Sequence, residues 1–206
     1  MSRYRGPKNR IARKFGANIF ARTRNPLLHK PNPPGVHGSK RKKKSDYGIQ
    51  LEEKQKLKAI YGMLTHKQLL GAYRHALKTP GNTAHNLLAR LECRLDNIVY
   101  RLRFANSIFA AQQLVSHGHV LVNDKKVDIR SFNVKPGMVI SLKEKTKNNV
   151  HVKISQDTAR VDLPEYLTFD AEKLIGKLEV QPEFDQIPMP LIVHVPLVCE
   201  FLAHTC

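Results

Sequence analysis

The chain has 206 residues, with 35 Lys and Arg against 17 Asp and Glu, so its formal net charge is +18. A hydrophobic fraction of 41% excludes a wholly disordered chain, because disordered chains carry too few apolar residues to build a core. The positive charge predicts a polyanionic partner: nucleic acid is the commonest, and a membrane surface is the alternative. The most apolar run, IPMPLIVHVPLVCEFLA, is interrupted by prolines, His194 and Glu200, so it does not predict a membrane span.

The charge is unevenly distributed along the chain. Residues 1–45 contain 14 basic and no acidic side chains, residues 46–156 contain 18 and 8, and residues 157–206 contain 3 and 9. We therefore expect the anion-binding surface in the first three quarters, and we expect the acidic last quarter to meet protein or solvent.

Two features predict a cytoplasmic protein. The N-terminal MSRYRGPKNRIARKFG lacks the apolar segment of a signal peptide. The spacings of Cys93, Cys199 and Cys206 match neither a disulfide framework nor a zinc site, so we expect reduced, structural thiols.

Residues 1–45 are expected to form a basic, extended arm with one short helix. Glycines and prolines interrupt the segment, and the run SKRKKK ends it. Apolar and aromatic side chains lie among its cations: Tyr4, Ile11, Phe15, Ile19 and Phe20. This mixture suits an arm that orders against folded RNA, and the alternative is a solvated tail or a localisation signal.

A helical domain is predicted from residue 46. The first helix buries a face with the spacing i, i+3, i+4, i+7, formed by Leu57, Ile60, Tyr61 and Leu64. An i,i+4 ion pair is expected between Glu52 and Lys56.

A second helix opens on a capping box from Thr65 to Gln68 and ends at Thr79-Pro80-Gly81. Its apolar stripe consists of Leu69, Leu70, Tyr73 and Leu77.

A third helix is predicted to start near Thr83 and to run through NLLARLECRLDNIVYRLRF. At about 100° per residue, one face collects four polar residues beside an apolar face: Arg90, Arg94, Asn97 and Arg101. Arginine suits a phosphate-binding row, because its planar fork can hold phosphate in two places. The alternative is a solvated face that pairs locally with Glu92 and Asp96, although both acids project elsewhere on an unbroken helix.

A short helix and a small β unit follow. Ser107 is expected to cap a helix that turns Ile108, Ala111 and Val115 inward and ends before Gly118. Alternation and turn residues then predict strands around a lysine-tipped hairpin, formed by Val120, Val122, Asn123-Asp124, Lys125-Lys126, Pro136-Gly137, Met138, Ile140 and Leu142.

At this point the residues resemble a known family. RLDNIVYRLRF followed by AAQQLVSHGHVLVNDKKVDIRSFNVKPGMVIS is similar to the αL RNA-binding module, which occurs in a universal ribosomal protein, some pseudouridine synthases and bacterial tyrosyl-tRNA synthetases. The flanking motifs RYRGPK, PGVHG, SDYGIQLEEKQKLKAIYG and GNTAHNLLARLECRLDN resemble the family of bacterial small-subunit ribosomal protein number four, over nearly the whole chain.

The resemblance implies a primary binder of 16S ribosomal RNA that grips a junction in the RNA 5′ domain and nucleates assembly of the subunit body. It implies small-subunit proteins number five and number three as neighbours, mRNA near its entrance, and an influence on translational accuracy. From the sequence itself, which shows no membrane span, zinc motif or enzymatic motif, we expect no membrane, no cofactor or metal, no small-molecule substrate and no catalytic residue. The RNA-binding residues that it implies are Arg3, Arg5, Lys8, Arg10, Arg13, His37, Lys40, Arg41, Lys42, Tyr47, Gln50, Lys54, Lys56, Lys58, Asn82, Arg90, Arg94, Asn97, Arg101, Lys125 and Lys126.

Several positions depart from the family pattern. Ile108 and Gln112 stand where the module usually has cations, which predicts weaker binding at that edge. Asp124 replaces the glycine of the hairpin tip, and Met138 replaces an aspartate after Gly137. Near the C-terminus, Val193-His194-Val195 replaces Ile-Asn-Glu, which leaves the contacts of that end open.

The sequence leaves two alternative functions to compare, an enzyme and a free RNA-binding regulator. Arg94-Leu95-Asp96 matches three residues around the catalytic aspartate of some pseudouridine synthases, but the chain has no room for their catalytic domain after the module. His117 and His119 fit packing or hydrogen bonding better than metal binding. A free RNA chaperone or regulator could use the module alone, yet it would not need the basic arm.

The fold predicted from these observations is α+β. It has a basic arm at 1–45, a helical domain at 46–92 with 175–206 packed back on it, and an RNA-binding module at 93–174 with a short antiparallel or mixed β unit.

Overall fold

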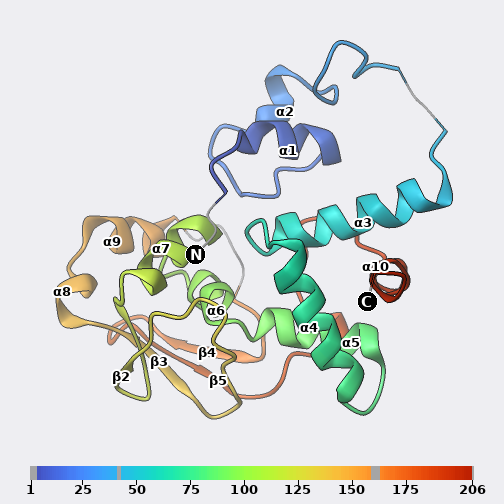
Figure 1. The fold of residues 1–206 in the computed structure, drawn as a ribbon. Helices are drawn as coiled ribbons and strands as arrows, with labels where there is room; N and C mark the ends of the chain where they lie inside the picture. The colour runs from blue at the N-terminus through green and yellow to red at the C-terminus, as the bar shows by residue number, and fades with distance from the viewer. Residues whose placement is uncertain (1–3, 41–42, 159–162, 206) are drawn as a thin grey trace. The chain divides into compact units, whose positions relative to one another are not determined.

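The computed structural model describes residues 4–40, 43–158 and 163–205, and the chain divides into two compact units. The first unit comprises residues 1–84 and 189–206, and the second comprises residues 85–188. The predicted α+β class is confirmed by helices combined with one antiparallel five-stranded sheet (Figure 1). Within the described ranges, no helix has both the length and the apolar character needed to cross a membrane.

The arm of the first unit is partly folded. It contains two short helices where one was predicted, α1 (Lys8–Phe15) and α2 (Pro26–His29). Arg13 joins the segments, because its Nε donates hydrogen bonds to the carbonyl oxygens of Lys30 at 3.1 Å and Asn32 at 3.0 Å. Ile19 and Phe20 are buried, so these two apolar residues of the arm form contacts within the protein.

The other helices that lie wholly in the first unit are α3 (Asp46–Ile60), α4 (His66–Lys78) and α10 (Val195–Ala203). The capping box at Thr65 and Gln68 is confirmed as the start of α4. The Leu69 side chain is fully buried, whereas Leu77 is 53% exposed, so the predicted apolar stripe ends before the last turn of α4.

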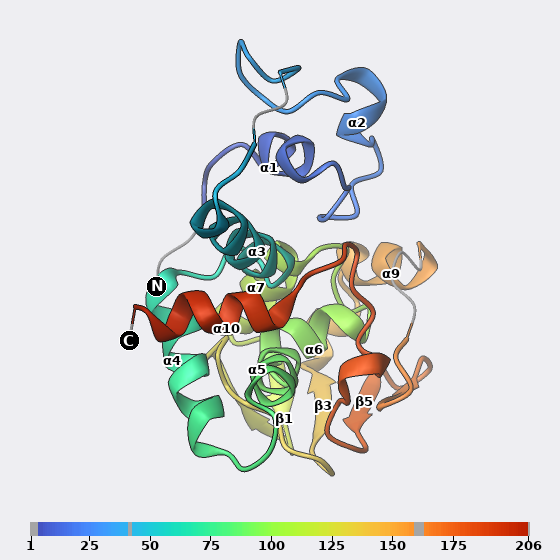
Figure 2. The same cartoon turned by 90° about the vertical axis from the view of Figure 1, so that its right-hand side faces the viewer.

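α10 crosses α3 and packs on it, as Figures 1 and 2 show from two directions. The Glu53 carboxylate accepts a hydrogen bond of 2.9 Å from the backbone N–H of His194. The ring of Phe201 lies near Tyr47 and Lys54: its centroid is 5.4 Å from the centroid of the Tyr47 ring and 3.8 Å from Lys54 Nζ. Within the first unit, these contacts join α10 to α3.

The second unit combines short helices with the sheet. Its helices are α5 (Thr83–Glu92, whose first residues belong to the first unit), α6 (Leu95–Arg101), α7 (Ile108–Ser116), α8 (Glu144–Lys147), α9 (Val150–Asp157) and the 3-10 turn η1 (Phe184–Gln186). Its strands are β1 (Val120–Val122), β2 (Lys125–Lys126), β3 (Val139–Leu142), β4 (Leu167–Asp170) and β5 (Ile175–Leu178), in the order β2-β1-β3-β5-β4.

β5 pairs with both β3 and β4, so residues 175–188 lie in the second unit and not with the helical domain, where they were expected. The sheet approaches α6 very closely at Gly176. A Cβ at this position would lie 2.4 Å from Leu102 Cδ2, so the contact requires glycine. Together with α6 and α7, the sheet encloses one core that contains Leu95, Ile98 and Ile140.

The prediction of one long third helix from Thr83 is wrong. The helix is interrupted at Arg94, whose backbone is extended with φ −66° and ψ 137°. The N–H of Leu95 donates to the carbonyl oxygen of Phe132 at 2.8 Å, and the N–H of Asp96 donates to that of Arg130 at 3.3 Å. Carbonyl groups of the 130–132 loop accept hydrogen bonds from these two N–H groups, so α6 starts as a separate helix.

The predicted local signals of the β unit are confirmed. Ser107 caps α7 by accepting a hydrogen bond from the N–H of Ala110, and Gly118 after the helix has φ +67°. Asn123 and Asp124 have φ of 46° and 63°, the combination required by a tight hairpin turn between twisted strands.

Candidate nucleic-acid interface

The described arm cations lie in a segment that supplies them with no acid. Arg5, Arg10, His37 and Lys40 are exposed, and Lys8 is half-buried. Arg3, Arg41 and Lys42, which the resemblance implies as contacts, lie outside the described residues. Arg13 is committed to the carbonyl oxygens of the arm itself, so its role in the structure is to hold the arm together.

Several predicted contacts on α3 are engaged within the protein. Gln50 donates a hydrogen bond of 3.1 Å to Glu200, and Lys56 pairs with Glu53 at 2.5 Å. The expected Glu52–Lys56 pair is wrong, because Glu52 pairs with Lys44. Among the residues of this helix that were predicted to bind RNA, Tyr47 is the most open, with 63% of its surface exposed.

A cationic cluster lies where the end of α3 meets the start of α4, and it consists of Lys54, Lys58 and His66. Burial lowers the pKa of Lys54, and the charge of Lys58 lowers it further. Burial also lowers the pKa of Lys58. Burial is the main cause that lowers the pKa of His66, and the charges of Lys54 and Lys58 add to it. None of the ion pairs found between described residues includes a member of this cluster.

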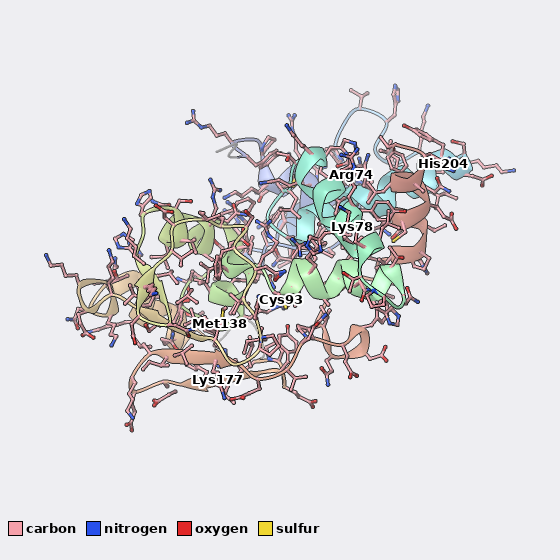
Figure 3. All side chains as sticks on the ribbon, turned by 60° about the horizontal axis from the view of Figure 1, so that its bottom comes forward. Arg74, Lys78, Cys93, Met138, Lys177 and His204 are labelled. Carbon is pink, nitrogen blue, oxygen red and sulfur yellow. The ribbon has the colours of Figure 1, made fainter. Side chains whose placement is uncertain are left out.

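Sequence reasoning missed a basic stripe on α4. Lys67, Arg74 and Lys78 are exposed, and their spacing of seven and four residues places them on one helix face. Figure 3 shows Arg74 and Lys78 on this helix. The sequence carries a signal for this stripe, because HKQLLGAYRHALK contains three Lys or Arg residues and no acid.

The predicted arginine row on α5 and α6 is not formed. Because the helix breaks, Arg94 and Arg101 turn inward, where they are 9% and 5% exposed. Arg94 grips Asp96 with two hydrogen bonds, from Nε at 3.0 Å and from Nη2 at 2.7 Å. Asn97 is 3% exposed and donates to the carbonyl oxygen of Glu92 at 3.1 Å.

Arg101 belongs to a buried network around Glu92. The Glu92 carboxylate is fully buried and accepts hydrogen bonds from Arg101 Nε at 2.6 Å and from the Tyr166 hydroxyl at 2.7 Å. Arg101 Nη2 also donates to the carbonyl oxygen of Pro188 at 2.9 Å. Burial, reinforced by Glu92, raises the pKa of Tyr166, which keeps its hydroxyl protonated as a donor. The guanidinium of Arg101 is therefore engaged within the second unit.

The remaining predicted contacts differ in exposure. Lys125 and Lys126 are exposed on β2 at the hairpin tip, and Lys126 passes closely over Gly118. Arg90 is half-buried, and burial lowers the pKa of its guanidinium. Asn82 is exposed, but its Oδ1 accepts a hydrogen bond of 2.9 Å from the N–H of Ala84 at the start of α5.

Asp96, His117 and His119, the side chains compared with catalytic or metal-binding groups, lie close to other side chains of the protein. Asp96 is 1% exposed, and besides Arg94 it accepts a 3.4 Å hydrogen bond from Gln112, a residue that departs from the family pattern. The rings of His117 and His119 lie 6.0 Å apart, and His119 Nδ1 is 3.1 Å from the Thr146 hydroxyl. Over the described part of the chain, no three metal-ligating side chains gather in one group.

Cys93 lies at the junction of α5 and α6 (Figure 3). Burial raises the pKa of its thiol to about 12. Burial similarly raises the pKa of Cys199 to about 11, so both free thiols are protonated at neutral pH and nearly inert.

Comparison with known proteins gives consistent matches along the chain. The family described as "Ribosomal protein S4/S9 N-terminal domain" matches residues 3–92, and the "S4 domain" family matches residues 93–140. The "Small ribosomal subunit protein uS4" of Protochlamydia amoebophila is 60% identical over 205 residues, covering 100% of both chains. Proteins of the same name from Chlamydia trachomatis serovar D and Chlamydia pneumoniae are 64% and 58% identical over 207 residues, covering 99% of both chains.

Proposed function

Because the chain belongs to the small ribosomal subunit protein uS4 family, we propose that it binds 16S ribosomal RNA as a component of the small subunit of cytoplasmic ribosomes. Within that role it grips a junction of the RNA 5′ domain and nucleates assembly of the subunit body. Its relatives are ribosomal proteins, and the proposal requires no enzymatic step.

The observation that carries the proposal is a large set of cations in segments of the chain that contain no acidic residue. The arm has no acidic residue before Asp46, and α4 has none at all. RNA phosphates supply the missing negative charge, and each neutralised phosphate releases counterions, which favours binding. A-form grooves present phosphates and 2′-hydroxyls rather than base edges, so recognition depends mainly on backbone and shape.

The structure changes the expected set of contacts. Arg94, Asn97 and Arg101 leave the set because they are buried and engaged. Four others leave it because they bond within the protein: Arg13, Gln50, Lys56 and Asn82. The half-buried Arg90 is also left out, and three cations of α4 join the set. The proposed contacts among the described residues are Arg5, Lys8, Arg10, His37, Lys40, Tyr47, Lys54, Lys58, Lys67, Arg74, Lys78, Lys125 and Lys126.

The acidic last quarter suits contacts with protein rather than RNA. Its charge of 3 basic against 9 acidic residues disfavours a polyanion. We assign it to neighbours such as small-subunit proteins number five and number three, near the mRNA entrance, through which the protein contributes to translational accuracy.

The test is the salt dependence of binding to a 16S 5′ domain transcript. If on the order of ten phosphates are contacted, log affinity falls against log salt with a slope of several units. A slope of one or less would contradict the proposal. Sedimentation distinguishes a subunit component from a free RNA regulator. A subunit component remains bound to small subunits, at one copy per subunit, through a high-salt wash.

A further inference from the structure

The Lys54–Lys58–His66 cluster has an unusual balance of charge and burial. Lys54 is 7% exposed, yet its ammonium group has no carboxylate partner among the described residues and lies over the Phe201 ring at 3.8 Å. Side chains this deeply buried are usually paired when they carry a charge, because an unpaired buried charge costs several kcal/mol. A ring face satisfies only part of that requirement.

The cluster draws its cations from two helices. Lys54 and Lys58 are one helical turn apart on α3, so both project from the same face. His66 is the first residue of the thirteen-residue α4, directly after its Thr65 cap. The positive end of the α4 dipole therefore adds to the same field.

His66 supplies the second sign of a missing group. Its Nδ1 is buried and has no hydrogen-bond partner among the described residues. Most buried polar atoms in native proteins are paired, so an unpaired ring nitrogen beside two lysines requires an explanation. A group that brings anionic oxygens would accept a hydrogen bond from protonated His66 and neutralise both lysines.

We propose that Lys54, Lys58 and His66 form a binding site for one phosphate group of the RNA backbone. The proposal rests on the proposed RNA-binding function and adds the ligand group and a dependence on pH. Phosphate fits better than carboxylate, because its several oxygens can accept hydrogen bonds from three donors supplied by two helices.

The site links RNA binding to proton uptake at His66. Burial, Lys54 and Lys58 together hold the pKa of His66 below its usual value, so the imidazole is neutral at pH 7 in the free protein. A bound phosphate reverses the charge balance and raises that pKa. A ligand that raises a pKa binds more tightly as the pH falls, so affinity should increase between about pH 7.5 and 5.5.

The direct test follows the His66 ring of the full chain by NMR during a pH titration. One titration contains inorganic phosphate at about 50 mM, and the other contains chloride at the same ionic strength. The expected result is a rise of about one pH unit in the His66 midpoint with phosphate. An unchanged midpoint overturns the proposal.

Lys58→Met is the informative variant, because methionine keeps most of the apolar stem and removes the charge. Without phosphate it should raise the His66 midpoint, since a repelling cation is gone, and it should abolish the further rise with phosphate. Lys153→Met, at an exposed position of α9, is the matched control and should leave both midpoints unchanged.

A second experiment measures binding to the 16S 5′ domain transcript. Lys58→Met should reduce the salt slope by about 0.7–0.9, as expected for one lost phosphate contact, whereas Lys153→Met should not.

If wild type shows a steep slope and Lys58→Met shows the same slope, the phosphate site is overturned and the proposed function stands. If inorganic phosphate shifts His66 but the slopes agree, the site binds an adventitious ion only, and the proposal also fails. If wild type shows no RNA binding, the proposed function itself fails.

Discussion

The arm and the α5–α6 junction both carry arginines, yet the structure uses them in opposite ways. In the arm, Arg5 and Arg10 are exposed in a segment without acids. At the junction, Arg94 and Arg101 are buried and paired with Asp96 and Glu92. The difference shows that an arginine's role follows from the acids and the burial around it, not from its spacing along a helix.

The energetic consequences of the two arrangements also differ. A buried ion pair is costly to break, because removal of one partner leaves an uncompensated charge in a low-dielectric surrounding. An exposed cation contributes little to folding but retains its full attraction for a polyanion. Stability should therefore depend on the junction, and RNA affinity on the arm.

The largest expected effect comes from breaking the buried pair. Arg101→Ala leaves the Glu92 carboxylate without its guanidinium, and we expect a loss of about 3–5 kcal/mol in the free energy of unfolding, measured by urea denaturation. Arg10→Ala is the matched control from the arm and should change stability by less than about 0.5 kcal/mol. Equal losses in the two variants would remove the distinction between the regions.

The next effect concerns binding. Replacing Arg5, Arg10 and Lys40 together with glutamine should weaken binding to the 16S 5′ domain transcript about a hundredfold at about 0.1 M salt and lower the salt slope by about 2–3. The urea midpoint should not move, because all three side chains are exposed. A variant with wild-type affinity would show that the arm is a solvated tail.

A smaller effect tests the geometry of the second junction pair. Arg94 binds Asp96 through two nitrogen atoms, and a lysine ammonium cannot reproduce this planar fork. Arg94→Lys should therefore cost about 1–2 kcal/mol of stability while it retains the charge. If the cost is zero, charge alone is sufficient at this position.

The smallest effect lies at the hairpin tip. Asp124 has φ +63°, so Asp124→Gly should raise the free energy of unfolding by about 0.5 kcal/mol, seen as a small increase in Tm. Asp128→Gly is the control: Asp128 does not have positive φ, and glycine there should be neutral or destabilising. A decrease in Tm for Asp124→Gly would contradict the role assigned to turn strain.

Local structure was largely predictable where a short motif decides it. The Thr65 capping box, the Ser107 cap and the Asn123-Asp124 turn each depend on residues that are adjacent in sequence. The helix break at Arg94 depends instead on carbonyl groups of the 130–132 loop, more than thirty residues away. No periodicity within the helix could have revealed this break. A helical wheel drawn for one continuous helix therefore placed Arg94 and Arg101 on an exposed face, whereas the structure buries them.

The candidate interface was predictable in its charge but not in its detail. Exposed cations follow from composition, so the arm and the lysine-tipped hairpin could be identified from sequence. Burial of Lys54 beneath Phe201 joins residues that are far apart in sequence, and it emerges only when α10 packs on α3. The α4 stripe could be predicted from the sequence, because the helix carries cations and no acid.

The discontinuity of the first unit has a consequence for the order of folding during synthesis. The second unit is continuous from residue 85 to 188, so it can fold while the remaining chain is still being made. α3 must wait for residues 195–203 before Phe201 can cover it. Until translation reaches the last helix, the nascent first unit exposes a hydrophobic surface, and a ribosome that stalls before residue 195 leaves it open to aggregation or to chaperones.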